Sequence, residues 1–282
     1  MMTMTPGDIA VLSATIAICT AILTVFGNWL INLRKVRLDM EKTKLEIVEL
    51  RARLEKTEAQ VNQGTPFFDF DDAVQGLTVV IERHLAALHK QVEDKNNLPL
   101  LHLKLIAVGL HYSQRFLDEE VDRDAAFPKL LRRYHDVRVD IEILFVDGEY
   151  LEAEYNPGVY GVDWVQECKA RKEDLGPLGE RLMYRHPNLN SFTARKYKML
   201  PQWHGWLINN DDLFLGTTTW EGNCLKVGQN QYRYLDAKKA TQDGGVGNAH
   251  VEAFRGWHTY LWSHSEPVCS TSRTNKPGTP TA

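Results

Sequence analysis

The hydrophobic and polar positions first predict a membrane-spanning helix. Residues 9–33 carry no charged side chain, and a run of this length as a helix is enough to cross a hydrocarbon core of about 30 Å. Arg34, Lys35 and Arg37 follow the run, whereas no Lys or Arg precedes it. We therefore expect a single-pass anchor with the N-terminus outside and the remainder cytoplasmic. A buried core helix and a cleaved signal peptide are the weaker alternatives, because the run lacks a polar face and a basic start.

The next segment, residues 34–63, repeats apolar side chains at the spacing of a heptad. One row recurs every seven residues and consists of Leu33, Met40, Ile47, Leu54 and Val61. The companion row consists of Val36, Thr43, Leu50 and Thr57. This pattern predicts a coiled-coil stalk that joins two or more copies of the chain into a homo-oligomer. A single solvated helix is the alternative, because two members of the companion row are threonine.

Residues 66–266 have the pattern of a folded domain, which begins after Gly64, Thr65 and Pro66 break the helix. Apolar positions predict strands at residues 101–108, 137–146, 192–200, 206–208 and 213–217. Helical spacing predicts helices at residues 71–93, from 113, and at 127–134, 162–172 and 251–262. The first two strands flank helices, so we expect them to be parallel. The predicted class is α/β, with a mixed sheet covered by helices. Residues 267–282 are rich in Ser, Thr, Pro and Gly, and we expect a disordered tail.

Composition narrows the range of functions only slightly. The net charge is −4 over 282 residues, which gives no general attraction to polyanions such as nucleic acid. The four cysteines are far apart in the sequence and show neither metal-ligand spacing nor the density of a secreted disulfide scaffold. They fit a reducing compartment.

Residues 198–217 contain the most informative motif. His204 lies just before the strand predicted at residues 206–208, Asp211 and Asp212 follow that strand, and Gly216 and Thr217 close the next one. This order resembles the signature of the phospholipase D superfamily, which has a His, a Lys two residues later, an Asp, and a Gly-Ser pair. At the level of pattern the resemblance extends from about residue 101 to residue 262. It implies a phospholipase D-like domain with His204, Asp211 and Thr217 as candidate catalytic residues.

The motif departs from the family at two positions. Trp206 stands where the family has its Lys, and Thr219 stands where it has a later Asn. Residues i and i+2 of a strand share one face, so the missing ammonium would have stood beside His204. Loss of one such electrostatic donor costs about 100- to 1000-fold in rate. Ordinary catalysis by His204 is therefore not expected.

Two further sets of residues bear on ligands. Lys196 and Lys198 share one face of the preceding strand and are the candidate phosphate-binding residues for a phosphodiester or nucleotide ligand. The alternative is that they form a solvated strand face. His250, His258 and His264 are separated by eight and six residues, which is not the i, i+4 spacing of a helical metal site. We predict no metal and no cofactor.

These observations lead to competing hypotheses of function. The first is a membrane-anchored, non-catalytic interaction or sensing/effector module with a phosphate-binding cleft. The second is an active membrane-bound phosphodiesterase, either a phospholipase or a nuclease. The family joins two signatures across a twofold axis, so a single-copy chain would have to pair two His204 residues in a dimer. A third is a structural anchor that recruits a partner through the stalk.

Overall fold

The computed structural model describes residues 35, 39–64, 66–68, 70–92, 98–154, 163–221, 224–226, 232–237 and 246–273. The chain divides into two compact units, Met1–Lys56 and Thr57–Ala282. The membrane span predicted at residues 9–33 lies outside the described residues. Within the part of the chain that is described, no helix is both long and apolar enough to cross a bilayer.

Residues 39–63 are helical, as the heptad pattern predicts. Four side chains of the predicted seam are exposed, namely Met40, Ile47, Leu50 and Leu54. The last two seam positions differ, because Thr57 and Val61 are buried in the second unit. The predicted stalk therefore contributes its last turns to the folded domain.

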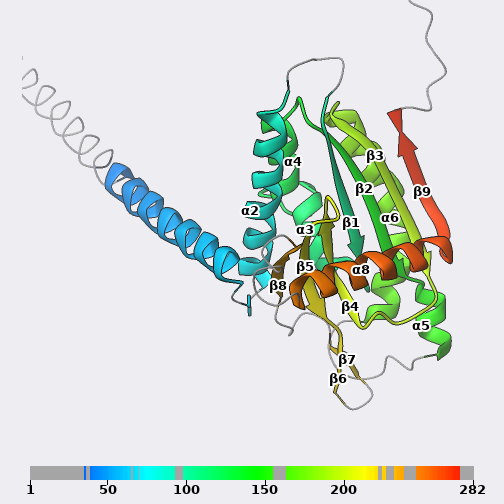
Figure 1. The fold of residues 1–282 in the computed structure, drawn as a ribbon. Coiled ribbons are helices and arrows are strands. Elements are labelled where there is room, and N and C mark those ends of the chain that lie inside the picture. The colour runs from blue at the N-terminus through cyan, green and yellow to red at the C-terminus, as the bar shows by residue number, and fades with distance from the viewer. Residues whose placement is uncertain are drawn as a thin grey trace, which may run out of the picture. The chain divides into compact units, whose positions relative to one another are not determined.

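Seven strands make the central sheet of the second unit. They are β1 (Leu100–Ile106), β2 (Arg138–Val146), β3 (Leu189–Tyr197), β4 (Trp203–Ile208), β5 (Asp212–Thr217), β8 (Arg233–Asp236) and β9 (Glu266–Ser272). Their order across the sheet is β8-β5-β4-β1-β2-β3-β9 (Figure 1). Strands β1, β2 and β3 are parallel, and every other neighbouring pair in this sheet is antiparallel. A small hairpin of β6 (Thr219–Glu221) and β7 (Cys224–Lys226) is separate.

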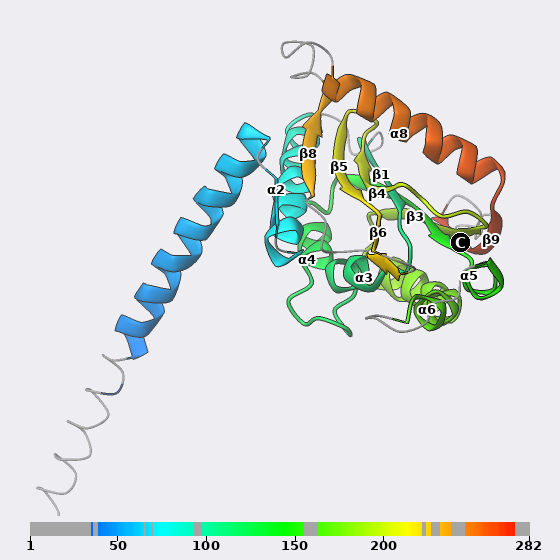
Figure 2. The ribbon, with the colours of Figure 1, turned by 90° about the horizontal axis from the view of Figure 1, so that it is seen from below.

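Helices cover the two faces of the sheet unequally. One face carries α2 (Phe70–His89), α3 (His111–Leu117), α4 (Ala126–Arg133) and α6 (Trp164–Arg185). The opposite face is crossed by α8 (Val246–Ser263), as Figures 1 and 2 show. A short helix, α5 (Gly148–Glu154), follows β2. Two hydrophobic clusters result. One includes residues of α2, α3, α4 and the second half of α6, and the other includes residues of α8, α5 and the start of α6.

The residue pattern of β1 and β2 explains this coverage. Both strands alternate between buried and half-buried residues in their first halves and become continuously buried toward their C-terminal ends. Ile106, Leu144 and Val146 lie in the cluster that contains α8 residues such as Val251 and Phe254. The strands are therefore apolar on both faces only where α8 covers the sheet. The predicted α/β class, mixed sheet and parallel first pair are confirmed.

Two sequence predictions in this domain are wrong. The tail prediction fails for residues 267–272, because β9 pairs with β3 and supplies partners for the backbone groups of that edge. The helix predicted at residues 162–172 continues to Arg185. Gly179 does not end it, since a Cβ there would lie 2.5 Å from the Phe192 ring, and glycine instead allows close packing of α6 on β3.

Candidate functional site

His204 lies near the start of β4, directly opposite Gly216 of β5. Its side chain is almost fully buried on the sheet face that carries α2, α3 and α4. The Nε2 atom lies 3.2 Å from the Tyr232 hydroxyl oxygen, and the Nδ1 atom lies 3.3 Å from Oγ1 of Thr218. Both ring nitrogens therefore have neutral hydroxyl partners.

Gly216 provides the space for this imidazole. A Cβ atom at position 216 would lie 2.4 Å from His204 Nε2 and 2.9 Å from a ring carbon of Tyr232. Any larger residue would displace one of the two rings. The His and Gly of the motif are thus brought together.

A small cavity adjoins His204. Its volume is about 50 Å³, which is enough for a few water molecules. It is lined by Ala73, Val74 and Leu77 of α2, by the C-terminal end of β1 and the segment that follows it, by α3, by Trp164 of α6, and by the β4–β5 hairpin with Tyr232. No Lys or Arg occurs among the described residues that line it. Trp206, in the place of the family's Lys, is buried with its ring edge-on to Phe116 at a centroid distance of 5.7 Å.

Burial changes the acid–base chemistry of His204. It lowers the pKa of the imidazole to about 4, because the charged form loses its hydration. The ring is therefore neutral at pH 7. A neutral imidazole keeps a lone pair for attack, but no cation among the described lining residues faces the charge that would develop on a phosphate.

The structure separates the predicted acidic residues from His204. Asp212 lies four residues before Gly216 on β5, which is about 13 Å along an extended strand. Its buried carboxylate accepts a hydrogen bond of 2.6 Å from the Tyr234 hydroxyl and contacts His84 Nε2 of α2. Asp211 belongs to the hairpin turn, where its N–H donates to the Ile208 carbonyl over 3.1 Å. These contacts fit a structural role.

The tight turn between β4 and β5 depends on two asparagines. Asn209 and Asn210 have φ values of 49° and 61°, the left-handed conformation that a tight hairpin turn requires at both central positions. Asparagine tolerates this conformation better than most residues. The two asparagines therefore allow a tight turn between β4 and β5.

Sequence reasoning missed four residues that contact His204 or Asp212. Thr217 is exposed, and it is Thr218 whose hydroxyl reaches His204. Tyr232 and Tyr234 flank the start of β8, a strand that the sequence analysis did not identify. The alternation of these two tyrosines with Arg233 is typical of a strand and could have indicated β8. His84 gave no signal, because its carboxylate partner is 128 residues away.

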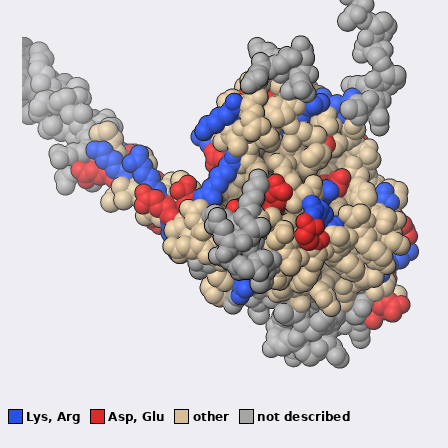
Figure 3. All heavy atoms as spheres, viewed as in Figure 1, with Lys and Arg blue, Asp and Glu red and all other residues tan. Residues whose placement is uncertain are grey.

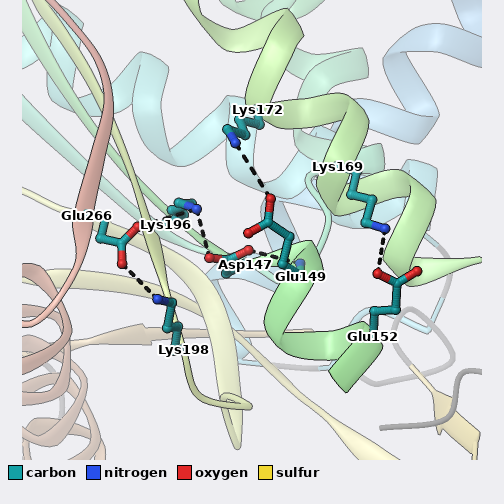
Figure 4. Close-up of polar contacts among 8 residues, drawn as sticks. All are labelled: Asp147, Glu149, Glu152, Lys169, Lys172, Lys196, Lys198 and Glu266. Carbon is teal, nitrogen blue, oxygen red and sulfur yellow. Dashed lines mark hydrogen bonds and ion pairs between the residues drawn. The ribbon is translucent and has the colours of Figure 1, made fainter. Parts of the chain in front are cut away.

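Lys196 and Lys198 are paired with carboxylates (Figure 4). The Nζ atom of Lys196 lies 2.8 Å from Oδ2 of Asp147 and 3.4 Å from Oε2 of Glu266. The Nζ atom of Lys198 donates to Oε1 of Glu266 over 2.8 Å. Asp147 follows β2 and also accepts the Glu149 N–H at the start of α5. Two positive charges thus face two negative charges.

The pKa values reflect this pairing. Burial alone would raise the pKa of Asp147, but hydrogen bonds from Lys196 and the Glu149 N–H hold it below its usual range. The hydrogen bond to Asp147 raises the pKa of Lys196. Both groups are therefore charged at neutral pH and satisfy each other.

The lysines are not brought to His204. Strands β1 and β2 lie between β3 and β4, which places β3 about 14 Å from β4 across the sheet. Trp164 of α6 packs over Gly109, which follows β1 by three residues. A Cβ atom at position 109 would lie 3.0 Å from the Trp164 ring. In this chain Lys196 and Lys198 therefore do not stand beside His204.

Other reactive side chains form no second site. Among the described residues, no cluster of three His, Cys, Asp or Glu side chains could hold a metal. His258 lies on the buried side of α8, with its Nε2 atom 3.9 Å from Oε2 of Glu142. Cys168 donates to the Val108 carbonyl over 3.3 Å, and burial raises the pKa of its thiol to about 12, which makes it unreactive.

Substitution of Lys196 should lower the stability of the fold much more than substitution of Lys198. Lys196→Met leaves the buried Asp147 carboxylate without its cation, and we expect the free energy of unfolding to fall by about 3 kcal/mol. Lys198→Met removes an exposed charge and should change stability little. Urea denaturation of the two variants measures the difference, and equal effects would contradict the assignment of Asp147 to Lys196.

Stability should also depend on the buried histidine. In the folded chain His204 stays neutral down to about pH 4, whereas the unfolded chain takes up this proton near pH 6.5. The unfolded state binds more protons between these values, so the free energy of unfolding falls with decreasing pH, by about 2 kcal/mol from pH 7 to pH 5. His204→Gln should remove this part of the pH dependence. An unchanged slope in urea titrations at the two pH values would mean that the imidazole is hydrated.

A scan against models of protein families finds no matching family. A search of curated proteins likewise finds no match. The resemblance to the phospholipase D superfamily therefore stays a prediction from the motif.

Proposed function

We propose that this chain is a single-pass membrane-anchored, self-associating interaction or sensing/effector module whose phospholipase D-like domain does not catalyse ordinary phosphodiester cleavage. The observation that carries the proposal is the environment of His204. The imidazole is buried, bonded to two hydroxyl groups and beside a cavity whose described lining has no Lys or Arg.

The phospholipase D-like assignment is supported by the hairpin. His204 lies opposite Gly216 on adjacent antiparallel strands, and the glycine is needed because the imidazole occupies its side-chain space. Trp206 points to the same sheet face as His204, where the family's Lys would stand. Its indole fills that place with an apolar group, which argues against a competent phosphate site.

Phosphate binding at Lys196 and Lys198 is not part of this proposal. Both ammonium groups are offset by Asp147 and Glu266. On the face of the domain in Figure 3, Lys and Arg are interspersed with Asp and Glu, without a large basic patch among the described residues. These features favour a protein partner or an uncharged ligand over a polyanion.

Self-association is supported by the exposed seam. Met40, Ile47 and Leu54 recur every seven residues, and Leu50 occupies the companion row. Exposed apolar side chains at this spacing are typical of a helix that packs against a second copy of itself. Membrane anchoring rests on the uncharged run at residues 9–33 and on the basic residues that follow it.

An active phosphodiesterase is the second candidate. The observation in its favour is that His204 is neutral at pH 7, which is the nucleophilic form. This function would require Tyr232 to move away from the imidazole and a second His204 to approach in a dimer. The first candidate requires neither change.

The seam makes a specific prediction about assembly. The double substitution Ile47→Asp and Leu54→Asp places charges in the predicted interface and should reduce the detergent-solubilised chain from an oligomer to a monomer. Leu45→Asp with Val48→Asp is the matched control, since these side chains are exposed but lie outside the seam. Light scattering after size exclusion gives the mass. An equal loss of mass in both variants would argue against a heptad interface.

Turnover of a generic phosphodiester tests the non-catalytic assignment. The full chain in detergent should hydrolyse bis(p-nitrophenyl) phosphate no faster than its His204→Ala variant. Hydrolysis that is present in the natural chain and lost in the variant would establish the phosphodiesterase instead.

A further inference from the structure

The end of the stalk helix is part of the domain core. Thr57 and Val61 are 2% and 1% exposed, whereas Leu54, one turn earlier, is 51% exposed. The Thr57 hydroxyl donates to Oε1 of Gln75 on α2 over 3.5 Å, and Val61 belongs to the hydrophobic cluster beneath α2. The last turns of the helix therefore cannot move without disturbing the packing around α2.

The segment after the stalk is bonded to Tyr232 by its backbone. The Phe67 N–H donates to the Tyr232 carbonyl over 2.8 Å, and the Tyr232 N–H donates to the Phe67 carbonyl over 2.9 Å. Phe67 is fully buried, with its ring 5.3 Å from that of Phe214. Gly76 of α2 admits this ring, because a Cβ at position 76 would lie 2.7 Å from it. Phe67 and Tyr232 are thus held as one unit.

Tyr232 in turn forms a wall of the His204 cavity. Its hydroxyl lies 3.2 Å from the Nε2 atom, and its ring stands edge-on to the imidazole at a centroid distance of 5.4 Å. The same ring stacks on Phe214 at 6.2 Å. One residue therefore contacts both the segment that follows the stalk and the His204 imidazole.

We propose that the Phe67–Tyr232 bridge couples the stalk to the His204 cavity. When residues 57–67 are held against α2, Tyr232 covers the imidazole. When they are displaced, Tyr232 moves with Phe67, or the bridge breaks, and His204 becomes accessible. The two bridge hydrogen bonds favour joint movement, because separating them would leave buried backbone groups without partners. This inference deepens the proposed function, on which it rests, by giving the stalk a means of regulating the cavity.

Chemical modification of His204 tests the coupling in the full chain. Diethyl pyrocarbonate carbethoxylates accessible neutral imidazoles, and mass spectrometry gives the rate at His204. Val61→Asp should displace the end of the stalk helix and raise this rate about tenfold, because modification requires local opening. Val48→Asp is the matched control, since it places the same charge on the same helix at an exposed position outside the seam. It should leave the rate unchanged.

Two outcomes would overturn the coupling. One is an unchanged rate in a folded Val61→Asp variant, and the other is an equal increase in Val48→Asp. If Val61→Asp does not fold, Val61→Ala in a double-mutant cycle with Tyr232→Phe replaces it. Val61→Ala should raise the modification rate at His204 in the natural background but not in Tyr232→Phe, where the tyrosine hydroxyl is already absent. Additive effects of the two substitutions on this rate would contradict the coupling. Phosphodiester turnover dependent on His204 would overturn the non-catalytic assignment but would leave the modification rates to decide the coupling.

Discussion

The pairing of His204 with Gly216 is the constraint on which the candidate site depends. The imidazole occupies the space above the glycine, so it is removed from water and its pKa falls to about 4. A neutral ring can be satisfied by the hydroxyl groups of Tyr232 and Thr218, and it needs no carboxylate beside it. This burial explains three features together. They are the low polarity of the cavity, the position of Tyr232 and the absence of a cation from the described lining.

Charged groups of the domain are satisfied in pairs away from this cavity. Asp212 is bonded to His84 and Tyr234 at one end of the β4–β5 hairpin, and Asp147 is paired with Lys196 beside α5. Each buried carboxylate has its own donors, so neither is available to orient or activate His204. The residues of the motif are therefore divided between a nearly apolar cavity and a structural hydrogen-bond network, although they are neighbours in the sequence.

The sequence was informative where a residue pattern is set by a local rule. Apolar positions predicted the strands β1 and β2, the helices between them predicted a parallel pair, and heptad spacing predicted the helix at residues 39–63. It failed where the deciding contact is distant. The strand β9 was missed because its pairing partner, β3, lies more than 70 residues earlier, and α6 was predicted too short because Gly179 was not known to face Phe192.

For the site, the sequence by itself determined that positions 204 and 206 share one face of a strand, since strand periodicity fixes which residues share a face. Only the tertiary structure decided what surrounds the imidazole. Tyr232 reaches it from a separate strand, and Lys196 is kept away by the two strands between β3 and β4. The physical reason is that strand order and burial depend on contacts between distant segments, whereas spacing along one strand does not.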